Sequence, residues 1–147
     1  MFETYKFIHV LAAIVWVGGS IMAQFFAARL SSAEPPHRLG FARDLRFAST
    51  RVLVPSGIIV FFAGSLMIEE GVGFEYADTF VAIGLLAVFV SLGIAIGFLI
   101  PATKRAINLM TSGQGPAAGV LIKKVTWTAR FVILVMLVAV WAMVVKP

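Results

Sequence analysis

The chain has 147 residues, of which 61% are hydrophobic and only 13% are charged, and its mean hydropathy is +1.00. A soluble domain is roughly 45–50% apolar and about 25% charged, and a chain this short cannot bury such an apolar excess in one water-soluble core. The composition therefore excludes a soluble enzyme, a disordered linker and a nucleic-acid-binding module, and the net charge of +5 fits basic loops beside a membrane.

Four stretches are apolar enough to cross the hydrocarbon layer as helices, which takes about 20 residues each. In chain order they cover 7–28, 52–68, 79–103 and 125–145. Each run is continuously apolar, apart from Arg130 in the last one, and lacks the in-and-out alternation of a barrel strand. We therefore predict an all-α bundle of four transmembrane helices, forming a single integral membrane domain over residues 1–147.

The first stretch differs from a cleaved signal peptide in two ways. The residues before it include Glu3 as well as Lys6, so they carry no net positive charge. Its apolar run also exceeds the usual hydrophobic region of about 7–15 residues. We expect this stretch to be retained as the first helix.

The charges of the connections predict the direction of the bundle. The connections after the first and third stretches are mainly basic, with Arg29, Arg38, Arg43, Arg46, Arg51, Lys104, Arg105, Lys123 and Lys124. The connection after the second stretch is acidic, with Glu69, Glu70, Glu75 and Asp78. Because loops rich in Lys and Arg stay in the cytoplasm, we expect both termini and the acidic connection outside, in a multi-pass protein of the cell inner membrane.

Two segments in the basic connections have their own patterns. Residues 35–50 place Leu39, Ala42, Leu45 and Ala48 at helical spacing with arginines between them. This pattern is typical either of a helix along the inner interface or of an extension of the second span. Residues 112–119 read SGQGPAAG, whose Gly and Pro favour a mobile linker, and they lack the Lys-Ser/Thr of a phosphate loop.

His9 is the one ionisable side chain well inside an uncharged apolar stretch. Such residues are costly in a membrane and usually face a protein interior or a cavity. Ala13 and Trp16 follow at four and seven residues, which places them on the same helical face, and Gly18 and Gly19 come directly after. We predict a cofactor-binding site made of His9, Trp16 and these two glycines near the outer leaflet. The alternative is a structural histidine that hydrogen-bonds between helices.

Two methionines fall at the predicted depth of His9. The second and fourth spans travel outward, which brings Met67 and Met143 near the outer edge. Thioethers select Cu(I), imidazole suits copper and iron, and His/Met ligation is known for haem, whereas thiolate sites are excluded because the chain has no cysteine. We predict metal ligation by His9, Met67 and Met143, with haem b or copper as the cofactor. The alternative is that both methionines are ordinary core or lipid-facing residues.

Small residues in the first three spans favour close helix packing, and Gly93 and Gly97 have the small-xxx-small spacing. The bulkier fourth span is expected to face lipid more. The lipid bilayer is the predicted partner, nucleic acid is not, and glycine seams of this kind also allow a homo-oligomer, with the site inside one chain or between protomers.

The motif His-x6-Trp-x-Gly-Gly of residues 9–19 resembles the copper-resistance protein D superfamily, whose small membrane proteins carry His-x6-Trp in a first helix. The resemblance continues through PSG at 55–57, Gly64, and PATKR at 101–105. The chain is similar in particular to an uncharacterised four-helix bacterial branch of that superfamily. The resemblance implies a haem or copper site at His9 and a role in redox chemistry or metal handling.

The haem-binding membrane protoporphyrinogen oxidase, another branch of that superfamily, is also similar. It shares the His-to-Trp spacing and a Val-Val-Lys-Pro-like end, here residues 144–147, and implies a haem-dependent enzyme with His9 as a haem ligand. That family has a Lys near the start of its third helix and an Arg soon after the first Trp, where this chain reads ADTF at 77–80 and SIMAQFF at 20–26. A haem-dependent oxidase and a non-catalytic membrane scaffold or assembly subunit therefore stand as alternative functions.

Overall fold

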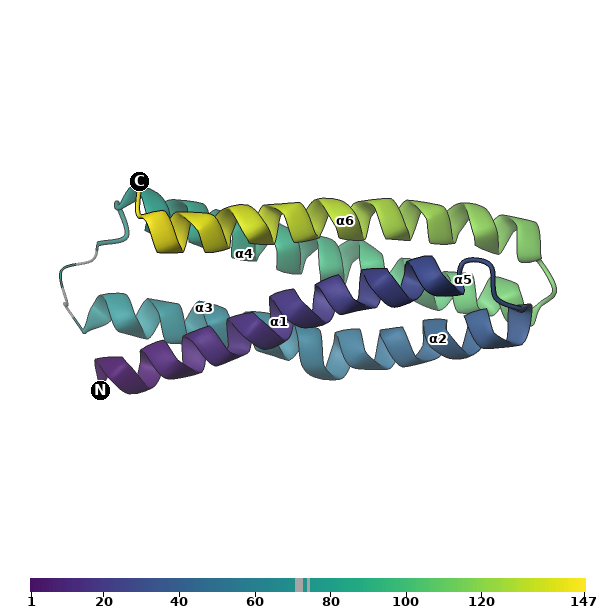
Figure 1. Ribbon diagram of the computed structural model, residues 1–147, viewed down its shortest axis with the longest axis horizontal. Helices are drawn as coiled ribbons and strands as arrows, with labels where there is room; N and C mark the ends of the chain where they lie inside the picture. Colours follow the sequence, from purple (N-terminus) through teal and green to yellow (C-terminus); the bar gives the residue numbers. More distant parts are fainter. Residues whose placement is uncertain (71–72, 74) are drawn as a thin grey trace.

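Four helical rods make up the computed structural model, which describes residues 1–70, 73 and 75–147. The first rod is α1 (Phe2–Leu30), and the last is α6 (Gly115–Val145). The second rod joins α2 (Pro35–Ala48), η1 (Ser49–Leu53) and α3 (Val54–Glu69). The third joins α4 (Thr79–Ile94), η2 (Ala95–Leu99) and α5 (Ile100–Thr111). The described residues contain helices and no strand, and the rods run alongside one another (Figure 1).

Each rod is long and apolar enough to cross a membrane. Large apolar side chains on the outside of the bundle, such as Phe25 at 69% exposed, suit contact with lipid rather than water. The prediction of an all-α fold with four helices long and apolar enough to cross a membrane is confirmed for the described part of the chain. The chain is a multi-pass membrane protein.

The rods extend well beyond the predicted spans. The second begins at Pro35 rather than at residue 52, the third ends at Thr111 rather than at 103, and the fourth begins at Gly115 rather than at 125. Hydropathy marks only the part of a helix that fits in hydrocarbon, whereas Arg and Lys are good helix formers outside it. Of the two interpretations of residues 35–50, the structure has the extension of the second span, with α2 joined to α3 through η1 (Figure 1).

The prediction of a mobile linker over residues 112–119 is wrong for residues 115–119, which form the first turns of α6. Pro116 lies in the first turn, where a missing N–H leaves no intrahelical hydrogen bond unmade. Residues 112–114 alone reverse the chain. Gly113 has a φ of 76°, a left-handed conformation that glycine adopts without a steric penalty.

A π-helical turn precedes a proline in both the second and the third rod. In η1 the N–H of Val54 donates to the carbonyl of Ser49, just before Pro55, and η2 precedes Pro101 in the same way. Proline has no N–H, and its ring collides with the carbonyl four residues earlier in an α-helix. The wider turn removes this collision, so each rod continues through its proline instead of breaking there.

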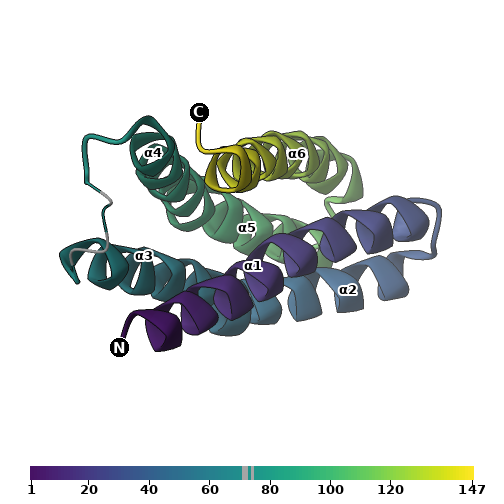
Figure 2. The same ribbon diagram turned by 60° about the vertical axis from the view of Figure 1, so that its left-hand side comes forward.

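The rods pack in two layers, with α1 beside α2 and α3, and α6 beside α4 and α5 (Figure 2). The buried core between them consists of Ala12, Trp16, Val60, Val88, Val132 and Met136. The predicted lipid-facing α6 supplies the last two of these and also exposes Trp141. An added Cβ at Gly93 or Gly97 would meet no atom within 4 Å, so this pair is not a packing seam within the described chain.

Candidate functional site

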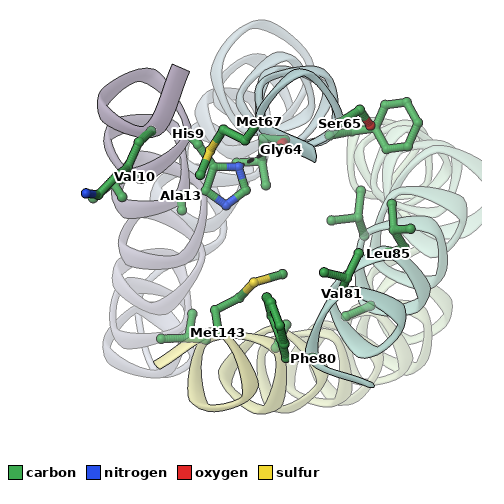
Figure 3. A pocket seen from close by; sticks show the side chains of 18 of the residues that line it. His9, Val10, Ala13, Gly64, Ser65, Met67, Phe80, Val81, Leu85 and Met143 are labelled. Carbon is green, nitrogen blue, oxygen red and sulfur yellow. Dashed lines mark hydrogen bonds between the residues drawn. The ribbon is translucent and has the colours of Figure 1, made fainter. Parts of the chain in front are cut away.

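A cavity of about 440 Å³ lies between the two layers (Figure 3). Phe2, Lys6 and Lys146 line it, so it is at the end of the bundle that carries both termini (Figure 1). α1, α3, α4 and α6 all contribute to its wall, which is overwhelmingly apolar. Sites for small molecules and cofactors are typically apolar hollows of about 300–1,000 Å³ with a few polar groups. The volume and the lining of this cavity fall in that class.

His9 is one of the few polar residues that line this cavity, and its ring points toward the centre (Figure 3). Its Nδ1 lies 2.9 Å from the main-chain oxygen of Val60 on α3. A carbonyl oxygen only accepts hydrogen bonds, so Nδ1 carries the proton and donates it. In the neutral ring the lone pair then belongs to Nε2, which makes this nitrogen the available ligand atom.

Gly64 makes room for this ring. An added Cβ at Gly64 would lie 3.1 Å from Cε1 and 3.2 Å from Nδ1 of His9. Val60 and Gly64 are four residues apart, so the accepting carbonyl and the gap lie on the same face of α3. One face of α3 therefore both anchors and orients the imidazole.

Met67 and Met143 line the same cavity as His9, reaching it from α3 and α6 (Figure 3). Gly84 on α4 accommodates Met143, since a Cβ there would run into the terminal methyl group of that methionine. Met136, which is buried, also lines the cavity. The structure thus brings together one imidazole and the two predicted thioethers, and adds a third.

Of the other predicted site residues, one lines the cavity and two do not. Trp16 is 6% exposed and lines the cavity, with its ring packed over Gly57. Gly18 and Gly19 do not line the cavity: Gly18 faces open space, and Gly19 lies against the side chain of Leu53. The glycines that touch the proposed ligands are Gly64 and Gly84, on helices other than that of His9.

Two lysines at the cavity rim were not among the predicted site residues. Lys6 lies 3.3 Å from the Glu3 carboxylate, and Lys146 lies 5.7 Å from the centre of the Phe80 ring. Both lysines line the cavity. The sequence did hold a signal for the first one, since Lys6 precedes His9 by three residues and so shares its helical face.

Within the described residues, no group of three or more His, Asp or Glu side chains is arranged to hold a metal ion. A metal at this site would therefore need thioether ligands or the nitrogens of a macrocycle beside His9. No family model matches the chain, and no curated protein or solved structure matches it either.

Proposed function

We propose that the chain is a membrane haem protein with a role in redox chemistry, in which His9 would hold haem b in the 440 Å³ cavity. The observation that carries the proposal is the orientation of His9. The Val60 carbonyl accepts a hydrogen bond from the Nδ1–H group, and Nε2 is left with a lone pair inside a hollow with an apolar wall. Haem is commonly held by a histidine nitrogen whose other ring nitrogen is hydrogen-bonded.

The residues around His9 fit a flat, largely apolar macrocycle with two carboxylates. Trp16, Val81 and Val88 supply apolar surface in the cavity wall. Lys6 and Lys146 at the rim offer ammonium groups that would bind the propionate carboxylates. Bound haem would supply one-electron chemistry, while the wall would exclude water from the iron.

The methionines support copper as a second candidate. Met67 and Met143 share the cavity with His9, and soft thioethers with an imidazole suit Cu(I). Under this alternative the role would be metal handling rather than electron transfer through haem.

The charge distribution supports an orientation for the site. The end of the bundle opposite the cavity carries the basic residues of α2, α5 and the start of α6, including Arg38, Arg105 and Lys123. Since Lys-rich and Arg-rich ends stay in the cytoplasm, the cavity would open toward the outer face of the cell inner membrane.

The test is the absorption spectrum and metal content of protein purified in mild detergent after expression with added haem precursor. Wild-type protein and His37→Ala are expected to show a Soret band, and His9→Ala is expected to lose it. His37 is the matched control, because it is the other histidine and is exposed on α2. If the wild type shows no Soret band but contains copper that His9→Ala loses, the cofactor is copper rather than haem. Absence of both, or haem retained in His9→Ala, would overturn the proposal and leave a packing role for His9.

A further inference from the structure

A second cavity, of about 480 Å³, lies at the opposite end of the bundle and shares no lining residue with the first. Its wall is formed by the end of α1, α2, α5 and the first half of α6. Three cationic side chains line it, Arg38 from α2 and Lys123 and Arg130 from α6. No Asp or Glu lines this cavity.

These three cations have no carboxylate partner within the described residues. The ion pairs there join the N-terminus to Glu70 and Lys6 to Glu3, both at the other end of the bundle. Arg130 lies 5.0 Å from the centre of the Trp127 ring, a contact that leaves its charge uncompensated. An anion placed in this hollow would be attracted by all three positive charges.

The rest of the wall is mainly apolar, so the cavity has a cationic part and an apolar part. Phe41, Leu45 and Ile122 line it together with the cations. The hydroxyl groups of Ser31, Thr103 and Thr126 also line it, and those of Ser31 and Thr103 donate to the carbonyls of Ala28 and Leu99 at 2.7 Å. The hydrogen-bond donors for an anion are therefore chiefly the cationic groups, and the apolar wall suits a hydrocarbon chain.

We infer that this cavity binds an anionic phospholipid. Its phosphate would lie among Arg38, Lys123 and Arg130, and the start of an acyl chain would lie along Phe41 and Leu45. Basic hollows between membrane helices bind anionic headgroups, and guanidinium groups pair with phosphate through two parallel hydrogen bonds. Free phosphate would satisfy the same cations but leave the apolar wall uncovered, which is why we assign the lipid. This inference does not depend on the proposed haem site.

The test is thermal unfolding of the purified, delipidated full chain in an uncharged detergent. Three additions are compared: phosphatidylglycerol, phosphatidylcholine and inorganic phosphate. A ligand that binds only the folded state raises Tm, so phosphatidylglycerol is expected to raise it by a few °C at saturation. Phosphatidylcholine is expected to leave Tm unchanged, and inorganic phosphate is expected to raise it less than phosphatidylglycerol does. An equal rise with phosphatidylcholine would indicate a general lipid effect, and a rise with phosphate alone would indicate a site for soluble anions; either result overturns the inference.

Two triple variants that lose the same charge distinguish lipid binding in the cavity from binding to basic residues elsewhere on the protein. The cavity variant combines Arg38→Gln, Lys123→Gln and Arg130→Gln. The control combines Arg43→Gln, Lys104→Gln and Lys124→Gln, at exposed positions that do not line the cavity. Only the cavity variant is expected to lose the Tm rise with phosphatidylglycerol. Loss of the rise in both variants, or in neither, overturns the inference.

Gly119 allows a test that keeps every charge. It lines the cavity, and an added Cβ there would meet nothing within 4 Å. Leucine at this position would extend into the cavity, and leucine also favours the helix more than glycine does. Gly119→Leu is therefore expected to fold and to lose the rise with phosphatidylglycerol, which keeps the inference testable if the triple cavity variant does not fold. An unchanged rise in Gly119→Leu would contradict the proposed position of the lipid.

Discussion

Gly64 on α3 lies so close to the imidazole of His9 that an added Cβ would be 3.1 Å from Cε1 and 3.2 Å from Nδ1. Because the ring also donates to the Val60 carbonyl on the same helix, it cannot move away from Gly64 without weakening that hydrogen bond. The missing side chain at Gly64 therefore fixes where the imidazole sits. Two positions one turn apart on α3, Val60 and Gly64, thus determine the orientation of one side chain of α1.

Gly64→Ala is expected to fold and to bind haem less tightly than the wild type. The ring would have to shift by a few tenths of an ångström, which reorients Nε2, and overpacking of this kind typically costs about 1–3 kcal/mol. Gly84→Ala is the control, since its Cβ would meet the flexible end of Met143, which can rotate away. Haem per protein and the position of the Soret band measure the difference. Equal haem binding in both variants would contradict the role given to Gly64.

His9→Asn separates anchoring from ligation. The amide nitrogen of asparagine occupies roughly the place of Nδ1, so a donor toward the Val60 carbonyl is retained, while the lone pair of Nε2 is removed. Hydrogen bonds between membrane helices average only about 0.6 kcal/mol, so Tm in detergent, measured without cofactor, is expected to change little. The Soret band is expected to disappear. If His9 only holds two helices together, His9→Asn will match the wild type in both measurements.

The two lysines at the cavity rim are expected to tighten haem binding without stabilising the fold. Replacing Lys6 or Lys146 by glutamine removes an ammonium group that would pair with a propionate, and a tenfold weaker affinity corresponds to about 1.4 kcal/mol. Lys124→Gln, which removes the same charge at an exposed position outside both cavities, is the control. Haem titration of apoprotein gives the affinities. Affinities equal to that of the control would exclude both lysines from the site.

Ser91 on α4 is expected to cost stability rather than contribute to it. Its side chain is 0% exposed, and its Oγ has no hydrogen-bond partner among the described residues. A buried polar group without a partner costs about 1–3 kcal/mol, so Ser91→Ala is expected to raise Tm by a few °C. Ser20→Ala is the comparison, because the Ser20 hydroxyl donates to the Trp16 carbonyl at 2.7 Å. A lower Tm for Ser91→Ala would mean that this hydroxyl has a hydrogen-bond partner inside the folded protein.

The membrane crossings were predictable because they follow from a composition that only a bilayer accommodates, but the ends of the helices were not. Arg43 and Lys123 lie in helices that hydropathy treats as connections. Charged residues reduce the fit to hydrocarbon without reducing the tendency to form a helix. Pro116 also looked like part of a linker, although proline in the first turn of a helix is favourable.

At the candidate site, the depth of a side chain in the membrane could be predicted from the sequence, but the rotation of each helix about its axis could not. The alternating direction of the spans put Met67 and Met143 at the level of His9, and the cavity brings these side chains together. Gly64, Gly84 and the Val60 carbonyl face it only because of the rotation of each helix about its own axis. Rotation is set by packing between helices, for which a nearly uniform apolar sequence carries little signal.

The π turn over Ser49–Leu53 changes which side of the second rod faces inward. On α2 the residues that line the basic cavity are Arg38, Phe41, Ala42 and Leu45. Continued at 3.6 residues per turn, the middle of this stripe would reach Ala63, whereas the part of α3 that lines the cavity of His9, from Val60 to Ile68, is centred one position later, at Gly64. Ile59 and Leu66 are 44% and 39% exposed. The additional residue in that turn rotates α3 about the axis of the rod by about 100° relative to α2. Deleting one residue there would swing Ile59 and Leu66 toward the imidazole and turn the carbonyl that anchors it away, while leaving the half of the rod that carries Arg38 as it is.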